Sequence, residues 1–142
     1  MAGYPVMNPP QSWLVVDIKH HPMAFLFMLV RPRLFLNNQP VPVRWGRNVI
    51  PVVPGQHHLS MYVPYMGRIG HAGGPLRMMP GDTVELEYRA PLTVFNAGAL
   101  GPAPQEWPGS TAMIVFYAVQ AGMAVLILLG VLGFMIYLMI AK

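Results

Sequence analysis

Two histidine doublets, His20-His21 and His57-His58, are the side chains of this sequence best suited to metal chemistry. Each doublet is followed within three residues by a methionine, and the chain contains no cysteine. Imidazole and thioether groups are soft ligands that suit copper, so the four histidines are candidate copper ligands. Neighbouring residues of a strand point to opposite faces, which prevents both histidines of an extended doublet from binding one ion. We therefore predict no cofactor, and retain a copper-delivery or copper-storage protein as an alternative.

The segment 57–63 alternates between polar and apolar side chains, as a half-buried strand does. Its apolar residues are expected to face the core. His57 then shares the core-facing side, whereas His58 lies on the outer side with Ser60 and Tyr62. This outer side is a candidate surface for a partner.

The five carboxylates of the chain form no spacing that acid–base or nucleophilic catalysis uses. Asp17 lies inside an apolar run and is the one candidate for a buried ion pair. Glu85 and Glu87 alternate with apolar residues and are predicted to lie on the solvated side of a strand. Asp82 follows a Pro-Gly turn, and Glu106 lies in a proline-rich segment. The sequence therefore predicts a protein that is not an enzyme.

Glycine and arginine residues give no sign of a nucleotide or nucleic-acid site. The run "GRIGHAGG" at Gly67–Gly74 lacks the Lys-Ser/Thr ending of a phosphate-binding loop and is predicted to be a flexible connection. The net charge is +4, but the basic residues are scattered and accompany no recognition motif. We predict no nucleic-acid partner.

The segment 112–141 is predicted to be a transmembrane helix. No charged residue lies between Glu106 and Lys142, and Gln120 is the only strongly polar side chain in the segment. A helix of this length spans about 45 Å, against roughly 30 Å for the hydrocarbon core of a bilayer. The protein is therefore expected in the cell membrane, with the bilayer as one partner.

The orientation in the membrane is predicted from the residues before the helix. The N-terminal segment does not resemble a secretory signal, and the preceding domain carries more Lys and Arg than Asp and Glu. Both features favour a cytoplasmic N-terminal domain. Lys142, beside the other end of the helix, favours the opposite orientation.

Short apolar or alternating runs bounded by proline and glycine predict strands in the first hundred residues. These runs are Trp13–Lys19, Arg33–Leu36, Val41–Trp45, Val49–Val53, His58–Val63 and Thr83–Arg89. They predict a mainly β domain over 1–100, either a β-sandwich or a small open barrel. A Pro/Gly-rich linker over 101–111 and the transmembrane helix over 112–141 are expected to follow.

An unbroken apolar run at 22–30 has two interpretations. It is either a buried central strand or short core helix, or a segment that lies on the bilayer surface. In the second case Phe25 and Phe27 would contact lipid, while Arg31 and Arg33 lie near anionic headgroups.

The predicted helix carries two faces suited to packing against other helices. Ala118, Gly122, Gly130 and Gly133 fall within an arc of about 120° and form a groove of small residues. Gln120 lies on roughly the opposite side, where an amide needs a partner inside a membrane. These faces predict other membrane-protein subunits as partners.

Two resemblances extend these expectations. The run "PVVPGQHHLSMYV", in which a Pro-Gly-x-His turn starts an alternating strand, resembles the PEGA-type β-sandwich pattern. That resemblance implies a binding appendage. The runs "VDIKHHP", "WGRNVIPVVPGQHH" and "VELEYRAPL" are similar to uncharacterised single-span membrane proteins of actinobacteria. Small proteins of this sort occur as accessory subunits of the bcc–aa3 respiratory supercomplex, so this second resemblance implies an accessory subunit of a respiratory cytochrome oxidase supercomplex.

Together these observations predict a non-catalytic accessory subunit of a multi-subunit membrane complex. A copper-binding protein and an extracytoplasmic ligand-binding β module are the alternatives.

Overall fold

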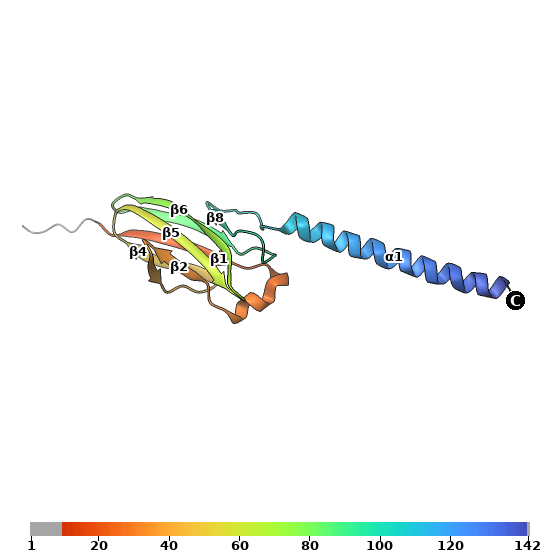
Figure 1. The fold of residues 1–142 in the computed structure, drawn as a ribbon. Coiled ribbons are helices and arrows are strands. Elements are labelled where there is room, and N and C mark those ends of the chain that lie inside the picture. Colours follow the sequence, from red (N-terminus) through yellow and green to blue (C-terminus); the bar gives the residue numbers. More distant parts are fainter. Residues whose placement is uncertain (1–9, 142) are drawn as a thin grey trace, which may run out of the picture. The chain divides into compact units, whose positions relative to one another are not determined.

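The computed structural model describes residues 10–141, which divide into a β domain that ends at Pro108 and a helical part that starts at Gly109 (Figure 1). The elements, in chain order, are β1 (Ser12–Lys19), η1 (Pro22–Leu29, a 3₁₀ helix), β2 (Arg33–Leu36), β3 (Gln39–Val41), β4 (Gly46–Val52), β5 (Gly55–Pro64), β6 (Arg68–Met78), β7 (Thr83–Arg89), β8 (Ala99–Gly101) and α1 (Ser110–Ile140).

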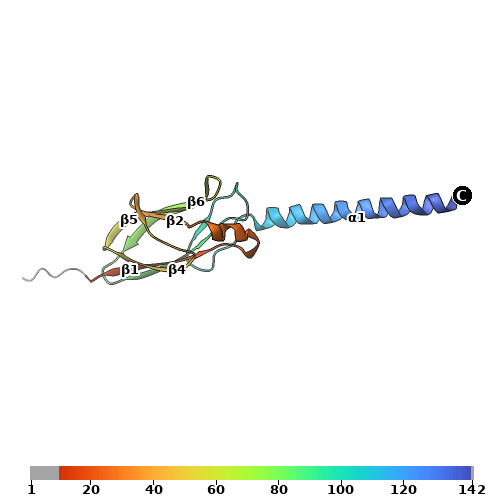
Figure 2. The ribbon, with the colours of Figure 1, turned by 90° about the horizontal axis from the view of Figure 1, so that it is seen from below.

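The β domain is built from two four-stranded sheets. Sheet A has the order β4-β1-β7-β8, and sheet B has the order β3-β2-β5-β6. Only β1 and β7 pair in parallel, whereas the other neighbours are antiparallel. The sheets form two layers that face each other (Figure 2). This arrangement confirms the predicted mainly β fold followed by one long apolar helix.

Alternating side chains of both sheets fill the core between them. Sheet A contributes Leu14, Val16, Ile18, Ile50, Val52 and Tyr88, and sheet B contributes Leu34, Leu59, Met61, Val63, Ile69, Leu76 and Met78. The Tyr88 hydroxyl crosses the core and donates a hydrogen bond to the Gly70 carbonyl at 2.6 Å. Burial raises the pKa of this phenol, which therefore stays neutral and joins the two sheets.

Two sequence predictions about sheet B are wrong. Of the predicted strand at Val41–Trp45, only Val41 lies in a strand, as the last residue of β3. The Trp45 indole instead donates to the Phe27 and Val30 carbonyls, at 3.1 and 2.8 Å. The predicted flexible connection at Gly67–Gly74 is instead the first part of β6.

The glycines of β6 allow close packing. A Cβ at Gly70 would lie 2.5 Å from Pro91 Cδ, and one at Gly73 would lie 2.4 Å from the Leu59 carbonyl oxygen. Gly70 also has a φ of +67°, which other residues rarely adopt.

Strand directions define two ends of the β domain, which we call the exit end and the opposite end. β1 and β7 both finish at the exit end, where the Pro108 carbonyl accepts a hydrogen bond from the Leu92 amide at 2.9 Å. β5 also finishes there, because Tyr65 packs edge-on against Phe27 of η1, with 5.4 Å between ring centroids. The exit end comprises η1, the connections 42–45, 65–67 and 90–98, and Pro108. The opposite end comprises the connections 37–38, 53–54 and 79–82.

The helix α1 spans 31 residues, and none of its side chains is buried. Its length and composition are sufficient to cross a membrane, which supports a membrane location with one span in the described residues. It begins at Ser110, inside the range predicted to be linker.

Candidate functional site

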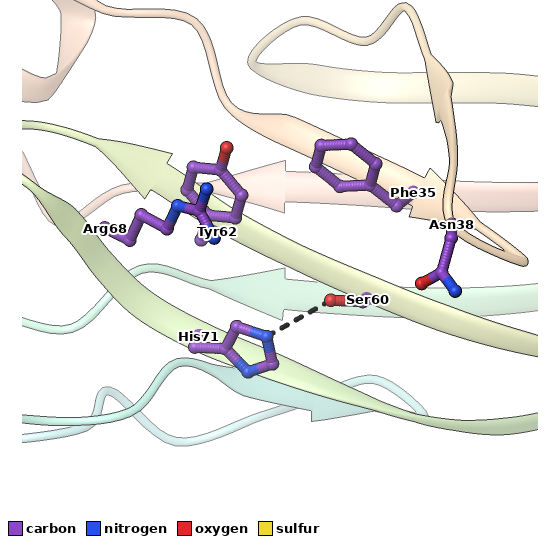
Figure 3. Close-up of a pocket in the computed structure, with 6 residues that line it drawn as sticks. All are labelled: Phe35, Asn38, Ser60, Tyr62, Arg68 and His71. Carbon is purple, nitrogen blue, oxygen red and sulfur yellow. Dashed lines mark hydrogen bonds between the residues drawn. The ribbon is translucent and has the colours of Figure 1, made fainter.

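The outer face of sheet B carries the clearest group of converging side chains, some exposed and some half-buried. They come from β2, the turn after it, β5 and β6, and they line an open hollow of about 270 Å³. Figure 3 shows the six lining residues: Phe35, Asn38, Ser60, Tyr62, Arg68 and His71.

Aromatic stacking and a cation dominate one side of this hollow. The Phe35 and Tyr62 rings lie nearly parallel, with an interplanar angle of 16° and 5.9 Å between centroids. The Arg68 guanidinium carbon lies 5.3 Å from the centroid of Tyr62. Because no carboxylate among the described residues lies within ion-pair distance of Arg68, its charge remains available to a partner. An aromatic plane beside an unpaired guanidinium suits recognition of another protein surface.

Ser60 and His71 lie on the other side of the hollow. The Ser60 hydroxyl oxygen and His71 Nε2 are 3.2 Å apart, which is hydrogen-bonding distance (Figure 3). A nucleophile with its base has the same spacing, but such a base is normally oriented by a third group. Within residues 10–141, no hydrogen bond from another side chain holds the second ring nitrogen of His71.

A β-bulge brings Arg68 and His71 to the same face. Met61 pairs with Ala72 and Val63 pairs with Ile69, so Gly70 and His71 together lie opposite Tyr62. The extra residue shifts the alternation of β6 by one, and residues three apart then share the outer side. The alternation of 57–63 correctly predicted Ser60 and Tyr62 on this outer face, whereas Phe35, Arg68 and His71 were not predicted there. The alternation of β2 could have revealed Phe35, whereas the bulge hid the other two.

The second histidine doublet is split as predicted. His57 is half-buried and links two turns. Its Nε2 donates a hydrogen bond to the Val53 carbonyl at 2.6 Å, and its Nδ1 accepts one from the Asn37 side-chain amide at 2.8 Å. His58 is exposed on the other side of β5.

The first doublet also has local contacts. His21 caps η1 by accepting the Met23 amide at Nδ1, and its ring packs edge-on against Trp107. His20 packs edge-on against Trp45, with 4.9 Å between centroids. Across residues 10–141 no three His, Asp or Glu side chains gather as a metal site would require.

The outer face of sheet A holds a network of charges around Glu87. The prediction that Glu87 is solvated is wrong, since only 3% of the residue is exposed. Its carboxylate accepts from Lys19 at 3.1 Å, from Arg89, and from the Gln105 amide at 3.3 Å. Asp17, the predicted buried partner, also pairs with Lys19 but keeps 37% of its side chain exposed.

The electrostatics of this network favour the charged forms. Burial alone would raise the pKa of Glu87, but the hydrogen bonds from Lys19, Arg89 and Gln105 outweigh it and lower that pKa. The hydrogen bond that Lys19 donates to Glu87, together with the one that it donates to Asp17, raises the pKa of Lys19. All these charges are paired within the domain, so the network has a structural role.

The segment after β8 covers this network. Trp107 lies beneath the Arg89 guanidinium, at 4.6 Å from ring centroid to guanidinium carbon, and Gln105 bonds to Glu87. Residues 102–108 are therefore attached to the domain, in a region where the sequence analysis expected a linker.

The residues predicted to contact the membrane surface fall into two groups. Phe25 is 62% exposed, and Arg31 and Arg33 are also exposed. Phe27 is buried, because η1 turns that ring into the core against Tyr65. Phe27 is therefore not available to lipid. The other interpretation, a buried strand or short core helix at 22–30, is wrong for most of these residues because they are exposed.

The residues predicted to pack against other helices all lie exposed on α1. These are Ala118, Gln120, Gly122, Gly130 and Gly133. A Cβ added at any of the three glycines meets no other atom within 4 Å. Each position thus has room in this chain for a larger side chain.

Comparison with protein-family models finds no match to the chain, and comparison with curated proteins finds none that is similar. The PEGA-type and actinobacterial resemblances therefore stay predictions.

Proposed function

We propose that this protein is a non-catalytic accessory subunit of a multi-subunit membrane complex. In this proposal α1 anchors the protein among other membrane helices, and the outer face of sheet B binds a partner subunit. The observation that carries the proposal is the group formed by the half-buried rings of Phe35 and Tyr62 and the exposed Arg68.

The chemistry of this group supports protein recognition over small-molecule binding. Tyrosine and arginine dominate the residues that contribute most to protein–protein affinity. The hollow of about 270 Å³ is open and falls below the roughly 300–1,000 Å³ typical of small-molecule pockets. A flat aromatic surface with one free cation is better matched by a second protein surface.

The composition of α1 supports the same proposal. Helices associate in membranes through small residues and through polar side chains that need partners. Gly122, Gly130 and Gly133 allow the backbone of another helix to approach closely. Gln120 carries an amide whose hydrogen bonds lipid cannot satisfy. The actinobacterial resemblance supplies the specific form of the proposal, in which the complex is a respiratory cytochrome oxidase and the β domain is cytoplasmic.

The direct test is purification of the full chain from its native membranes in mild detergent, followed by mass spectrometry of the proteins that accompany it. The double variant Tyr62→Ala/Arg68→Ala should lose those proteins while keeping its folded spectrum. Arg77→Ala, an exposed arginine elsewhere on β6, is the matched control and should retain them. Equal recovery from the double variant and the control would refute binding through sheet B.

A second test addresses the helix. Gly122→Leu and Gly133→Leu should release the protein from the complex, because leucine fills the groove of small residues. Ala121→Leu places the same leucine side chain outside that groove and should have no effect. Since leucine is a better helix former than glycine by roughly 1 kcal/mol, a loss cannot come from unfolding of α1. Unchanged co-purification of both glycine variants would contradict the proposed packing.

A further inference from the structure

Several large apolar side chains are exposed at the exit end of the β domain. They come from three connections that are far apart in the sequence: Met23, Phe25, Leu26, Met28 and Leu29 of η1, Met66 of the turn 65–67, and Val94 and Phe95 of the connection 90–98. Leu29 is 81% exposed, Met66 93% and Phe95 94%. Exposed apolar side chains in this number at one end of a domain mark a contact with a membrane or another molecule.

Local contacts hold this surface in place. The Trp45 indole donates to the carbonyls of Phe27 and Val30, and His21 caps the first turn of η1. Phe27 faces the core, so the remaining large side chains of η1 are directed outward. The exposure therefore follows from the fixed geometry of η1.

The opposite end of the domain differs. Among its described connections, the large exposed apolar side chains are Val53 and Met79. The remaining exposed residues there include Asn37, Asn38 and Asp82, which are typical turn residues. Large exposed apolar side chains are thus more numerous in the connections of the exit end than in those of the opposite end.

Four arginines at the exit end make no ion pair among the described residues. Arg31 and Arg33 follow η1, Arg44 precedes Trp45, and Arg68 follows the turn 65–67; all four are exposed. The described ion pairs use Lys19, Arg47 and Arg89 instead. Glu106 is the exposed carboxylate of the segment that leaves the domain at this end. The surface therefore carries an excess of positive charge beside its apolar side chains.

The chain itself requires the exit end to lie near the bilayer. Pro108 is hydrogen-bonded to Leu92 within the domain, and α1 begins two residues later at Ser110. Two Cα–Cα steps span at most about 7.6 Å. A helix of 31 residues is about 46 Å long, close to the roughly 40–45 Å of a bilayer with its headgroup regions. From Ala112 onward, Gln120 is the only strongly polar side chain among the described residues of α1, so Ser110 belongs at the membrane surface.

We propose that the exit end is a lipid-binding surface that enters the headgroup region of the same bilayer that α1 crosses. The exposed side chains of η1, Met66 and Phe95 would insert at the boundary between headgroups and acyl chains. Arg31, Arg33, Arg44 and Arg68 contact anionic phospholipid headgroups. The inference uses a different surface from the partner-binding face of sheet B, except that Arg68 lies at the border of both.

The absence of cysteine makes a clean labelling experiment possible. Full-length variants Leu29→Cys, Met66→Cys and Phe95→Cys are labelled with a fluorophore and placed in nanodiscs that contain lipids with a nitroxide near the headgroup. Val53→Cys and Met79→Cys, exposed apolar positions at the opposite end, are the controls. We expect strong quenching at the three exit-end positions, as from a depth of about 5–10 Å, and little at the controls.

Equal quenching by the nitroxide lipid at both ends would overturn the proposal. So would exit-end labels that lipid does not quench and that become shielded from solvent only when partner proteins are present. Shielding by partners would identify this surface as a protein interface. The quenching comparison uses nanodiscs that contain only this chain, so a partner subunit cannot contribute to it, whereas the shielding by partners is tested in the native membranes.

The arginines are tested by changing the lipid. Nanodiscs of phosphatidylcholine alone are compared with nanodiscs that also contain phosphatidylglycerol. Anionic lipid should increase the quenching at Leu29→Cys, and this increase should be lost when Arg31, Arg33 and Arg44 are replaced by glutamine. Arg77→Gln, near the opposite end, should preserve it. An increase that survives the triple replacement would refute the proposed headgroup contacts.

Discussion

Sheet A and sheet B both carry charged and aromatic side chains on their outer faces, but the two faces differ in what surrounds those side chains. On sheet A, Glu87 lies between Lys19 and Arg89, and residues 102–107 cover it. On sheet B, Tyr62 and Arg68 contact each other and face an open hollow. The charges on the outer face of sheet A are paired and covered by other parts of the chain, whereas those on the outer face of sheet B are not.

This difference shows which charges are available for function. A buried ion that is paired on several sides holds the fold together, and its removal leaves its partners unsatisfied. An exposed guanidinium above an aromatic ring contributes little to folding and keeps its charge for a partner. Residue type alone would have assigned the two faces the same role.

The largest effect is expected where the two sheets meet, at Gly70. Gly70→Ala places a methyl group against Pro91 and the Tyr88 hydroxyl and also strains a positive φ. We expect the free energy of unfolding to fall by about 3 kcal/mol, from overpacking and backbone strain together. Thermal unfolding of the full chain in detergent measures this effect. Gly74→Ala is the control on the same strand, because a Cβ there meets no atom within 4 Å; equal losses would mean that β6 is not packed as described.

The next largest effect is expected on sheet A. Glu87→Gln removes the buried negative charge and leaves Lys19 and Arg89 without their shared partner. Hydrogen bonds to charged groups contribute about 1.5–3 kcal/mol, so we expect a loss of about 2 kcal/mol in unfolding free energy. Glu85→Gln breaks an exposed pair with Arg47 and should cost less than about 1 kcal/mol. A smaller effect at Glu87 than at Glu85 would show that the network is not structural.

The acid dependence of stability tests the same network. The pKa of Glu87 lies below its ordinary value of 4.5 in the folded protein, so the unfolded chain binds the proton first. The contribution of Glu87 is then complete above pH 4.5 and is lost as the pH falls through the lowered pKa. Denaturation curves of the native chain and Glu87→Gln should therefore converge on acidification. A difference that stays constant below pH 4.5 would contradict the proposed ionised carboxylate.

The sequence predicted the β domain well because the patterns that identify its strands involve residues that are close together in the chain. Alternation in 59–63 and 83–89 and the Pro-Gly turns depend on neighbouring residues, and the lack of charge after Glu106 marks the helix. What it could not predict depends on distant residues. The run 67–74 resembles a loop until Leu59, Tyr88 and Pro91 are known to approach its glycines.

The candidate site was predictable in part for the same reason. Tyr62 followed from the alternation of its own strand. His71 and Arg68 required the bulge at Gly70, and the burial of Glu87 required a segment that lies almost twenty residues further along the chain. The apolar run at 22–30 had two interpretations because hydrophobicity alone does not distinguish core from lipid.

Within sheet B, His57 and His58 provide a comparison between adjacent residues. His57→Ala removes the two hydrogen bonds that join the turns at Asn37 and Val53, and we expect a loss of about 1 kcal/mol in unfolding free energy. His58→Ala should change stability by less than about 0.5 kcal/mol, because its side chain is exposed. Calorimetry with copper accompanies the measurement. A stoichiometric copper site lost in both variants would favour the alternative of a copper-binding protein.

The smallest effect on stability is expected at Arg68, and it would separate the two faces most sharply. Arg68→Ala removes an exposed contact with Tyr62, so the unfolding free energy should change by no more than about 0.5 kcal/mol. Arg89→Ala, the corresponding change on sheet A, takes a bond from the buried Glu87 and the cation from Trp107, and should cost about 2 kcal/mol. Chemical unfolding of the two variants side by side gives the contrast. If Arg68→Ala destabilises the domain as much as Arg89→Ala, then Arg68 stabilises the fold through contacts within sheet B. Its charge is in that case not available to a partner.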